Sequence, residues 1–195
     1  MKPLIDLELL ISYGAFCKEF NKSEIILYEG EVAHFYHQVV NGSVKMYNTN
    51  DEGKEFTQGY FSDGQSFGEP PLFIDEKYPA FAAAFQKATV VKLSKEQFFK
   101  ILEDFPQIQQ QFLKLLARRI HNKATTSKDI INQKPEFRIQ AFLDFCKKSN
   151  EKELIDFTRQ EIANSTGLRV ETVIRTLSKM HKKQIVEIIN HKIYY

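Results

Sequence analysis

Four polar side chains gather within seven residues near the C-terminal end of this chain, at Arg169, Glu171, Thr172 and Arg175. Arginine can pair bidentately with O6 and N7 of guanine, and glutamate can accept a hydrogen bond from N4 of cytosine. A helix that enters the major groove of DNA meets the base edges with the side chains of its first turns. If a helix starts here, these four residues are predicted to read base pairs.

The local pattern predicts two helices joined by a sharp turn. Thr158 can cap a first helix, and Glu161 three residues later completes a capping box. Gly167 stands where the chain must turn, and an apolar helical spacing then begins again. The residues predicted to face inward are Ile162, Ala163, Val170, Val173, Ile174 and Leu177. Helix, glycine-containing turn and helix over about 20 residues is typical of a helix-turn-helix.

The flanks of this segment supply candidates for phosphate contacts. Arg159 and Gln160 follow the cap residue Thr158, where a helix N-terminus favours phosphate. Two short strands are predicted about Asn190-His191, as in the wing of a winged helix. The lysines that either contact phosphate there or are plain surface are Lys182, Lys183 and Lys192. The alternative for the whole segment is a helical hairpin with solvated charges.

Basic residues concentrate in the last third of the chain. Residues 1–133 carry 15 Lys and Arg against 17 Asp and Glu, whereas residues 134–195 carry 12 against 8. A positive segment of this kind is typical of a surface that binds a polyanion. The charge distribution therefore agrees with DNA as the partner of the predicted helix-turn-helix.

Composition argues against several other classes of protein. No run of 18 apolar residues spans a membrane, and Asp6 and Glu8 interrupt the apolar N-terminus, so a cytoplasmic location is expected. The only cysteines, Cys17 and Cys146, form no disulfide framework and are expected to be small buried residues. No phosphate loop, nucleophile elbow or metal-ligand cluster is recognisable. We therefore expect no catalytic residue, no metal and no cofactor.

The first half of the chain has the pattern of a β-fold. Short apolar runs separated by turns predict strands at 25–28, 35–40, from 44 onward, 56–61, 80–86 and 89–93. Asn41-Gly42 is suited to a tight hairpin with positive φ. Many short strands with glycine turns favour a sandwich, barrel or jelly roll.

The apolar period becomes helical from Ser94, a predicted N-cap with Gln97 completing a capping box. Pro106 is expected to start a second helix that runs to about Gln133. Its later part, 117–131, is mostly polar with a thin apolar line. Such a line is typical of a dimer seam, and the alternative is a helix packed on its own β-domain.

Two groups of motifs occur together, one in each half of the chain. They are Leu27–Glu31, Asn41–Val44, Asp51–Glu55 and Gly64–Glu69 in the first half, and Thr158–Ala163 and Glu171–Arg175 in the second. With these motifs the chain resembles the CRP/FNR superfamily of bacterial transcription regulators. The resemblance implies an α+β fold with an N-terminal double-stranded β-helix (jelly roll), a long dimerisation helix and a C-terminal winged helix-turn-helix.

The resemblance also implies domains and partners. The expected limits are 1–105 for a cyclic-nucleotide-binding-like sensor domain, 106–133 for the dimerisation helix and 134–195 for the DNA-binding domain. Lys134-Pro135 marks the last boundary, because proline biases its predecessor away from helix, and Ser149-Asn150 is expected to close the helix that follows. The implied partners are a second copy of the chain, double-stranded DNA with a palindromic operator, and RNA polymerase.

The recognition helix departs from the family at one position. The family has an Arg-Glu-Thr-Val-x-Arg pattern, and Val170 occupies the place of its first arginine. The preferred DNA sequence should therefore differ. Whether Arg169 substitutes is open, because one helical residue corresponds to about 100° of rotation.

The effector pocket departs further. Gly68 and Glu69 are present, and Glu69 could accept from a ribose hydroxyl, but Pro79 and Ala80 stand where the family binds the cyclic phosphate with Arg and Ser or Thr. Neither offers a cation or a side-chain donor to the phosphate. The sequence predicts a DNA-binding regulator without a cyclic AMP response and with an unknown effector. The alternative, a small-molecule sensor that acts through protein contacts, is opposed by the basic C-terminal segment.

Overall fold

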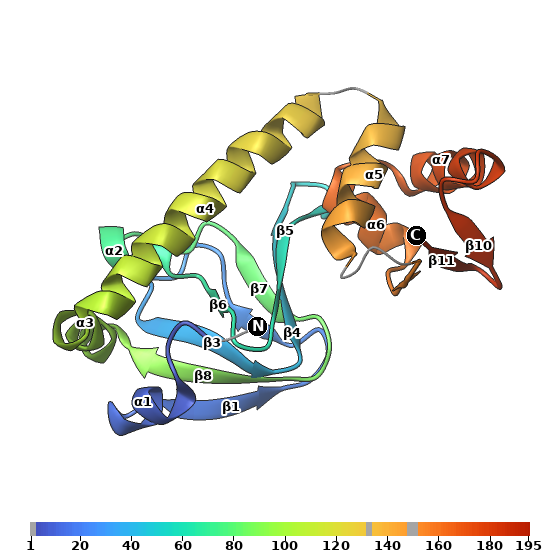
Figure 1. Ribbon diagram of the computed structural model, residues 1–195. Coiled ribbons are helices and arrows are strands. Elements are labelled where there is room, and N and C mark those ends of the chain that lie inside the picture. Colours follow the sequence, from blue (N-terminus) through green and yellow to red (C-terminus); the bar gives the residue numbers. More distant parts are fainter. Residues whose placement is uncertain (1–2, 132–133, 148–151) are drawn as a thin grey trace. The chain divides into compact units, whose positions relative to one another are not determined.

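The computed structural model describes residues 3–131, 134–147 and 152–195, with side chains described up to residue 124 in the long helix. The chain divides into two compact units (Figure 1). The first consists of Met1–Asn50 and Thr57–Arg119, and the second of Asp51–Phe56 and Ile120–Tyr195. They are called the β-roll unit and the winged-helix unit below.

The β-roll unit contains two four-stranded sheets, with strand orders β1-β8-β3-β6 and β2-β7-β4-β5. The strands are β1 (Phe16–Phe20), β2 (Ile25–Leu27), β3 (Phe35–Asn41), β4 (Ser43–Thr49), β5 (Glu55–Ser62), β6 (Ser66–Phe67), β7 (Phe81–Ala84) and β8 (Ala88–Ser94). This architecture confirms the predicted β-roll. Strands β1 and β6 were not predicted, because the first four residues of β1 are exposed and β6 has only two residues.

Gly42 makes a turn of a different kind from the predicted hairpin. Its φ of +92° fits the expectation of a left-handed residue, and a Cβ at this position would lie 2.2 Å from the carbonyl oxygen of Lys87. However, β3 and β4 belong to different sheets. The Asn41-Gly42 dipeptide therefore turns the chain from one sheet to the other.

The helices of the first part of the chain are α1 (Leu7–Ser12), α2 (Pro70–Ile74), α3 (Lys95–Asp104) and α4 (Pro106–Ile131). Ser94 accepts a hydrogen bond from the amide of Gln97, so the predicted N-cap is confirmed. The predicted start at Pro106 is confirmed as well. The ring of Phe98 in α3 stacks on Tyr36 of β3 with centroids 4.7 Å apart. Aromatic packing of this kind fixes α3 against the sheet.

The winged-helix unit contains α5 (Pro135–Cys146), α6 (Arg159–Thr166) and α7 (Val170–Lys182), with a three-stranded sheet of order β10-β11-β9. Its strands are β9 (Leu154–Ile155), β10 (Glu187–Ile189) and β11 (Lys192–Tyr194). One apolar core joins these elements, and its fully buried members include Ile139, Ile162, Val173 and Ile193. The predicted winged helix-turn-helix is therefore confirmed. The predicted end of α5 at Ser149-Asn150 lies outside the described residues.

The two cysteines differ in environment. Cys146 is half-buried, and burial raises the pKa of its thiol to about 12. Cys17 is exposed, which corrects the expectation that both cysteines are buried. The reason is that β1 lies at the edge of its sheet. No helix in the described ranges combines the length and the apolarity that a membrane span requires.

Candidate nucleic-acid interface

Helix α6 is set by the capping box that the sequence predicts. The hydroxyl of Thr158 accepts from the amide of Glu161 at 3.2 Å, and the Glu161 carboxylate accepts from the amide of Thr158 at 2.7 Å. At the other end, Gly167 has a left-handed φ of +68° and its amide donates to the carbonyl of Ala163. Both ends of α6 are thus satisfied by local groups, and the turn that leads into α7 has a defined geometry.

Helix α7 presents the four predicted base-reading residues at its N-terminal end. Arg169 is the N-cap, and Glu171 and Thr172 lie in the first turn. The side chains of Arg169, Glu171 and Arg175 are exposed, and that of Thr172 is half-buried. The opposite face of α7 is held in the core by Val173, Leu177 and Met180, each at most 1% exposed. The helix is therefore anchored by one face and offers the other to a partner.

Two of the six predicted inward-facing residues behave differently from the others. Val170, which takes the place of the family's first arginine, is half-buried and packs against the core. Ile174 is 51% exposed, which corrects its assignment to the inward face. The spacing 170, 173, 174, 177 satisfies a helical period, but only three of these positions fit on the side that contacts the core.

The predicted phosphate-binding residues already have partners within the chain. The guanidinium of Arg159 donates to the backbone carbonyl of His191, and the Gln160 amide donates to Asn164 at 2.8 Å. An arginine has five N–H donors, so Arg159 keeps further donors for phosphate while it is held by the wing turn. Among the wing lysines, the ammonium of Lys183 lies 2.9 Å from the carboxylate of Glu136, whereas Lys182 and Lys192 are exposed.

The wing is a two-residue hairpin. Ile189 pairs with Lys192, and the two residues between them, Asn190 and His191, both have positive φ, at 47° and 63°. Positive φ at both central positions is the type I′ turn, whose twist matches that of the flanking strands. The turn fixes the backbone carbonyl of His191, which accepts the hydrogen bond from Arg159. This hydrogen bond holds the start of α6 against the wing.

In the β-roll unit, the glycine and glutamate predicted for an effector pocket are tightly enclosed. Gly68 has a φ of +73°, and a Cβ there would lie 2.9 Å from the side chain of Leu27. The side chain of Glu69 is fully buried. Its Oε2 accepts from Nη1 of Arg119 at 2.7 Å, and Nη2 of the same arginine donates to the carbonyl of Ser66 at 2.6 Å. An arginine of α4 is therefore the partner of one oxygen of this carboxylate, and the other oxygen, Oε1, is buried without a hydrogen-bond partner among the described residues.

Sequence reasoning missed Arg119. The guanidinium also lies over the ring of Phe61, 5.4 Å from its centroid. It therefore contacts the Glu69 carboxylate, the Ser66 carbonyl and the Phe61 ring. A signal was present: Arg119 follows the buried Phe112 by seven residues, which places both on the same face of a helix. Its partner, 50 residues earlier in the chain, could not be read from helix periodicity.

The two positions expected to lack phosphate ligands differ in burial, because Pro79 is exposed. Ala80 is fully buried. The carbonyl of Pro79 accepts from the side-chain amide of Asn48 at 2.6 Å, and the same nitrogen lies 3.3 Å from the carboxylate of Glu29. The polar groups next to Pro79 are thus an amide and a carboxylate, and the carboxylate would repel a phosphate.

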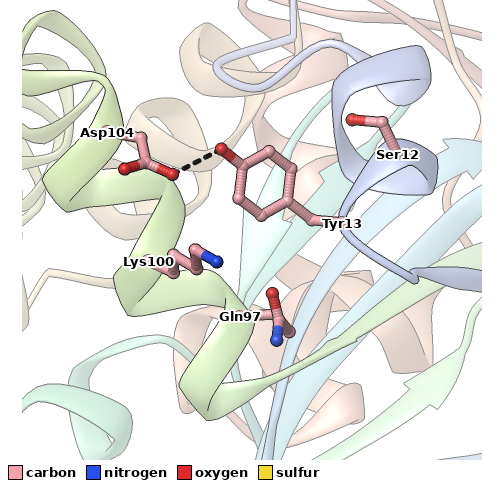
Figure 2. Close-up of a pocket in the computed structure, with 5 residues that line it drawn as sticks. All are labelled: Ser12, Tyr13, Gln97, Lys100 and Asp104. Carbon is pink, nitrogen blue, oxygen red and sulfur yellow. Dashed lines mark hydrogen bonds between the residues drawn. The ribbon is translucent and has the colours of Figure 1, made fainter.

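A further pocket of about 340 Å³ lies between α1 and α3 (Figure 2). It is lined by Ser12, Tyr13, Gln97, Lys100 and Asp104. Figure 2 shows the Tyr13 hydroxyl pointing at Asp104, to which it donates at 2.6 Å. This hydrogen bond raises the pKa of Tyr13. The pocket is open, its lining is partly exposed and partly half-buried, and no arrangement of nucleophile and base is found among these residues.

Two family models match the chain, one in each half. A cyclic nucleotide-binding domain matches residues 17–105, and a Crp-like helix-turn-helix domain matches residues 138–194. Both matched segments contain the motifs quoted from the sequence. The second also contains the capping box, the glycine turn and the exposed face of α7.

Curated relatives are similar over most of the chain. The cAMP-activated global transcriptional regulator CRP of Pasteurella multocida is 28% identical over 193 residues, which cover 94% of this chain and 92% of the relative. The anaerobic regulatory protein of Haemophilus influenzae is 25% identical over 182 residues, which cover 88% of this chain and 69% of that protein. These relatives are regulators with different signals.

The fold is found in solved structures of such regulators. The c-di-GMP-responsive global regulator CLP of Xanthomonas campestris has a TM-score of 0.82 at 19% identity, and the match covers 96% of both chains. FixK2 of Bradyrhizobium japonicum has a TM-score of 0.79 at 21% identity, over 92% of this chain and 91% of that one. With both domains matched in order and the capped helix-turn-helix intact, the chain belongs to the CRP/FNR superfamily of DNA-binding transcription regulators.

Proposed function

We propose that this regulator works in the cytoplasm as a homodimer, that it reads a two-fold symmetric operator through α7, and that it does so without cyclic AMP. The observation that carries the proposal is the exposed N-terminal end of α7, where Arg169, Glu171 and Arg175 stand together while the opposite face is locked in the core. A polar end of this kind on an anchored helix suits the major groove.

The base-reading assignment is Arg169, Glu171, Thr172 and Arg175. Thr158, Arg159 and Gln160 at the start of α6 are assigned to the DNA backbone, where they orient the protein without reading sequence. The contact from Arg159 to the wing supports this assignment, because it holds the guanidinium next to a helix N-terminus. Domain limits of 1–105, 106–133 and 134–195 remain our working division of the chain.

Dimerisation is proposed through α4. Leu113 and Ile120 are each 70% exposed, seven residues apart on the same helix. Between them, Leu116 is half-buried and Ala117 is exposed. A seven-residue apolar repeat is the pattern of a helix that packs along a second copy of itself, and a dimer places two recognition helices on a symmetric site.

Three features of the β-roll unit support the proposed independence from cyclic AMP. Arg119 pairs with Oε2 of the buried carboxylate of Glu69. Asn48 and Glu29 lie at Pro79, where a phosphate would need a cation. Of the lysines nearby in sequence, Lys87 is paired with Glu19 at 3.0 Å on the surface. The effector, if the protein uses one, is of another chemical class.

The DNA assignment is tested by selecting an operator from random duplexes and measuring its dissociation constant by fluorescence anisotropy. We expect a symmetric sequence whose binding weakens as salt rises. Arg175→Ala should weaken specific binding about 10- to 100-fold, because a base-reading arginine is worth about 1–3 kcal/mol. Lys179→Ala, an exposed cation farther along the same helix, should leave the sequence preference unchanged.

An unchanged affinity and preference in Arg175→Ala would contradict the proposed orientation of α7. Selection that enriches no sequence at all would favour the alternative, a sensor whose helix-turn-helix binds protein.

The dimer is tested by sedimentation of Leu113→Glu and Ile120→Glu. Both variants should be monomeric and lose binding to the symmetric operator. Ile74→Glu, which changes a 65% exposed isoleucine of α2, serves as the control and should sediment as the wild type does. A dimer that survives both changes in α4 would place the interface elsewhere.

For the effector, calorimetry with cyclic AMP and cyclic GMP should give no heat of binding, and neither nucleotide should change operator affinity. Micromolar binding of either nucleotide would refute this part of the proposal.

A further inference from the structure

Ile174 is out of place among the apolar residues of α7. It is 51% exposed, whereas Val173, Leu177 and Met180 on the same helix are between 0% and 1% exposed. A single exposed apolar side chain is common on protein surfaces and requires no explanation by itself. What distinguishes Ile174 is the set of side chains around it.

Those neighbours are the predicted base readers. In an α-helix, positions i, i+3, i+4 and i+7 lie on one face, so Glu171, Ile174, Arg175 and Ser178 form one stripe along α7. Glu171, Arg175 and Ser178 are exposed together with Ile174. Ile174 therefore lies one turn after Glu171, at the edge of this stripe, on the surface that DNA covers if α7 enters the major groove.

The major groove offers one apolar group to such a side chain, the C5 methyl of thymine. We propose that Ile174 determines sequence specificity by contacting a thymine methyl in each half-site, next to the base pairs that Glu171 and Arg175 read. The inference rests on the proposed DNA-binding function. The contact discriminates against cytosine, which presents an amino donor and no methyl at this edge.

The size of the effect follows from the methyl group. Burial of one CH₂-sized apolar group corresponds to about a fourfold change in a binding constant. A symmetric dimer makes the contact twice, so removal of both methyls should weaken binding about 15-fold. Loss of a hydrogen bond to an arginine would act on guanine positions, so the two contributions can be told apart by base.

The experiment uses the full-length protein and the operator it selects. Each thymine is replaced symmetrically by deoxyuridine, which removes only the methyl group. The wild type should lose about 15-fold in affinity at one thymine position per half-site. Ile174→Ser should bind the unmodified operator more weakly by a similar factor and should no longer distinguish thymine from deoxyuridine at that position, as expected for two groups in contact.

Ile11→Ser is the matched control, because Ile11 is 47% exposed on α1 in the β-roll unit. It should keep both the wild-type affinity and the full sensitivity to deoxyuridine. The measurement on the wild type needs no variant, so poor folding of Ile174→Ser cannot obscure it.

The inference is overturned if the wild type binds the thymine and deoxyuridine operators equally at every position, or if Ile174→Ser keeps the discrimination. In both cases sequence-specific binding would still support the proposed function. If the wild type binds no sequence specifically, the proposed function and this inference fail together.

Discussion

In the β-roll unit the carboxylate of Glu69 is fully buried and has Arg119 of the same chain as its partner, whereas in the winged-helix unit Arg169, Glu171 and Arg175 lie exposed at the N-terminal end of α7. The first arrangement uses charges to hold the protein together, and the second leaves them for another molecule. A family model is matched in each half of the chain. A family match therefore does not show which site is still open to a ligand; the contacts of each charged group do.

The largest effect on stability is expected from replacing Arg119 in the β-roll unit. Arg119→Met should lower the free energy of unfolding by about 3–5 kcal/mol, because it leaves the buried carboxylate of Glu69 without a cation. Urea unfolding measures the loss. The double variant Glu69→Gln, Arg119→Met should recover most of the stability, since it removes the unpaired charge.

The control for this prediction is Lys87→Met, which breaks the exposed pair with Glu19. Exposed pairs contribute about 0–1 kcal/mol. If Arg119→Met loses no more free energy of unfolding than Lys87→Met, the proposed contrast between the two units is wrong, because the buried carboxylate of Glu69 would then not need its arginine.

A second test uses His37, which is buried in the β-roll unit between the rings of Phe35 and Phe67. Burial, with a smaller contribution from Lys92 and a weak opposing one from the Phe35 backbone, lowers the pKa of His37 to about 3. The unfolded chain binds this proton near pH 6.5. The free energy of unfolding should therefore fall as the pH drops below about 6.5, by about 2 kcal/mol at pH 5.

Urea unfolding at pH 7.5 and pH 5 checks this expectation against His37→Gln, whose amide does not titrate. That variant should lose about 2 kcal/mol less between the two pH values than the wild type. His34→Gln changes an exposed histidine and should behave as the wild type does. Equal pH dependence of the free energy of unfolding in wild type and His37→Gln would mean that His37 binds a proton as readily in the folded protein as in the unfolded chain.

The smallest effect is expected in the winged-helix unit. Thr158→Ala removes the hydroxyl that accepts from the amide of Glu161 and should cost about 1 kcal/mol. Hydrogen exchange should show faster exchange in the amides of α6, with those of the β-roll unit unchanged. Thr158→Ser keeps the acceptor and serves as the control. Faster exchange in both units would show that they unfold together, and would weaken their treatment as separate bodies.

Local patterns were sufficient for the helix-turn-helix. The capping box of Thr158 and Glu161 and the left-handed Gly167 involve residues no more than a few positions apart. The same holds for Ser94 and for the start of α4 at Pro106. Such signals are set by hydrogen bonds and steric limits between neighbours in the chain, so they can be read without knowledge of the rest of the molecule.

The sequence by itself determined the two kinds of domain, the start of α4 and the capped helix-turn-helix, including the end of α7 where the proposed base-reading residues lie. Only the tertiary structure decided that Ile174 faces outward, that β1 forms an edge strand with Cys17 exposed, and that Arg119 reaches Glu69. Each of these depends on which groups from distant parts of the chain occupy the space beside a residue. Periodicity gives the face of a helix, but packing decides how wide the buried part of that face is.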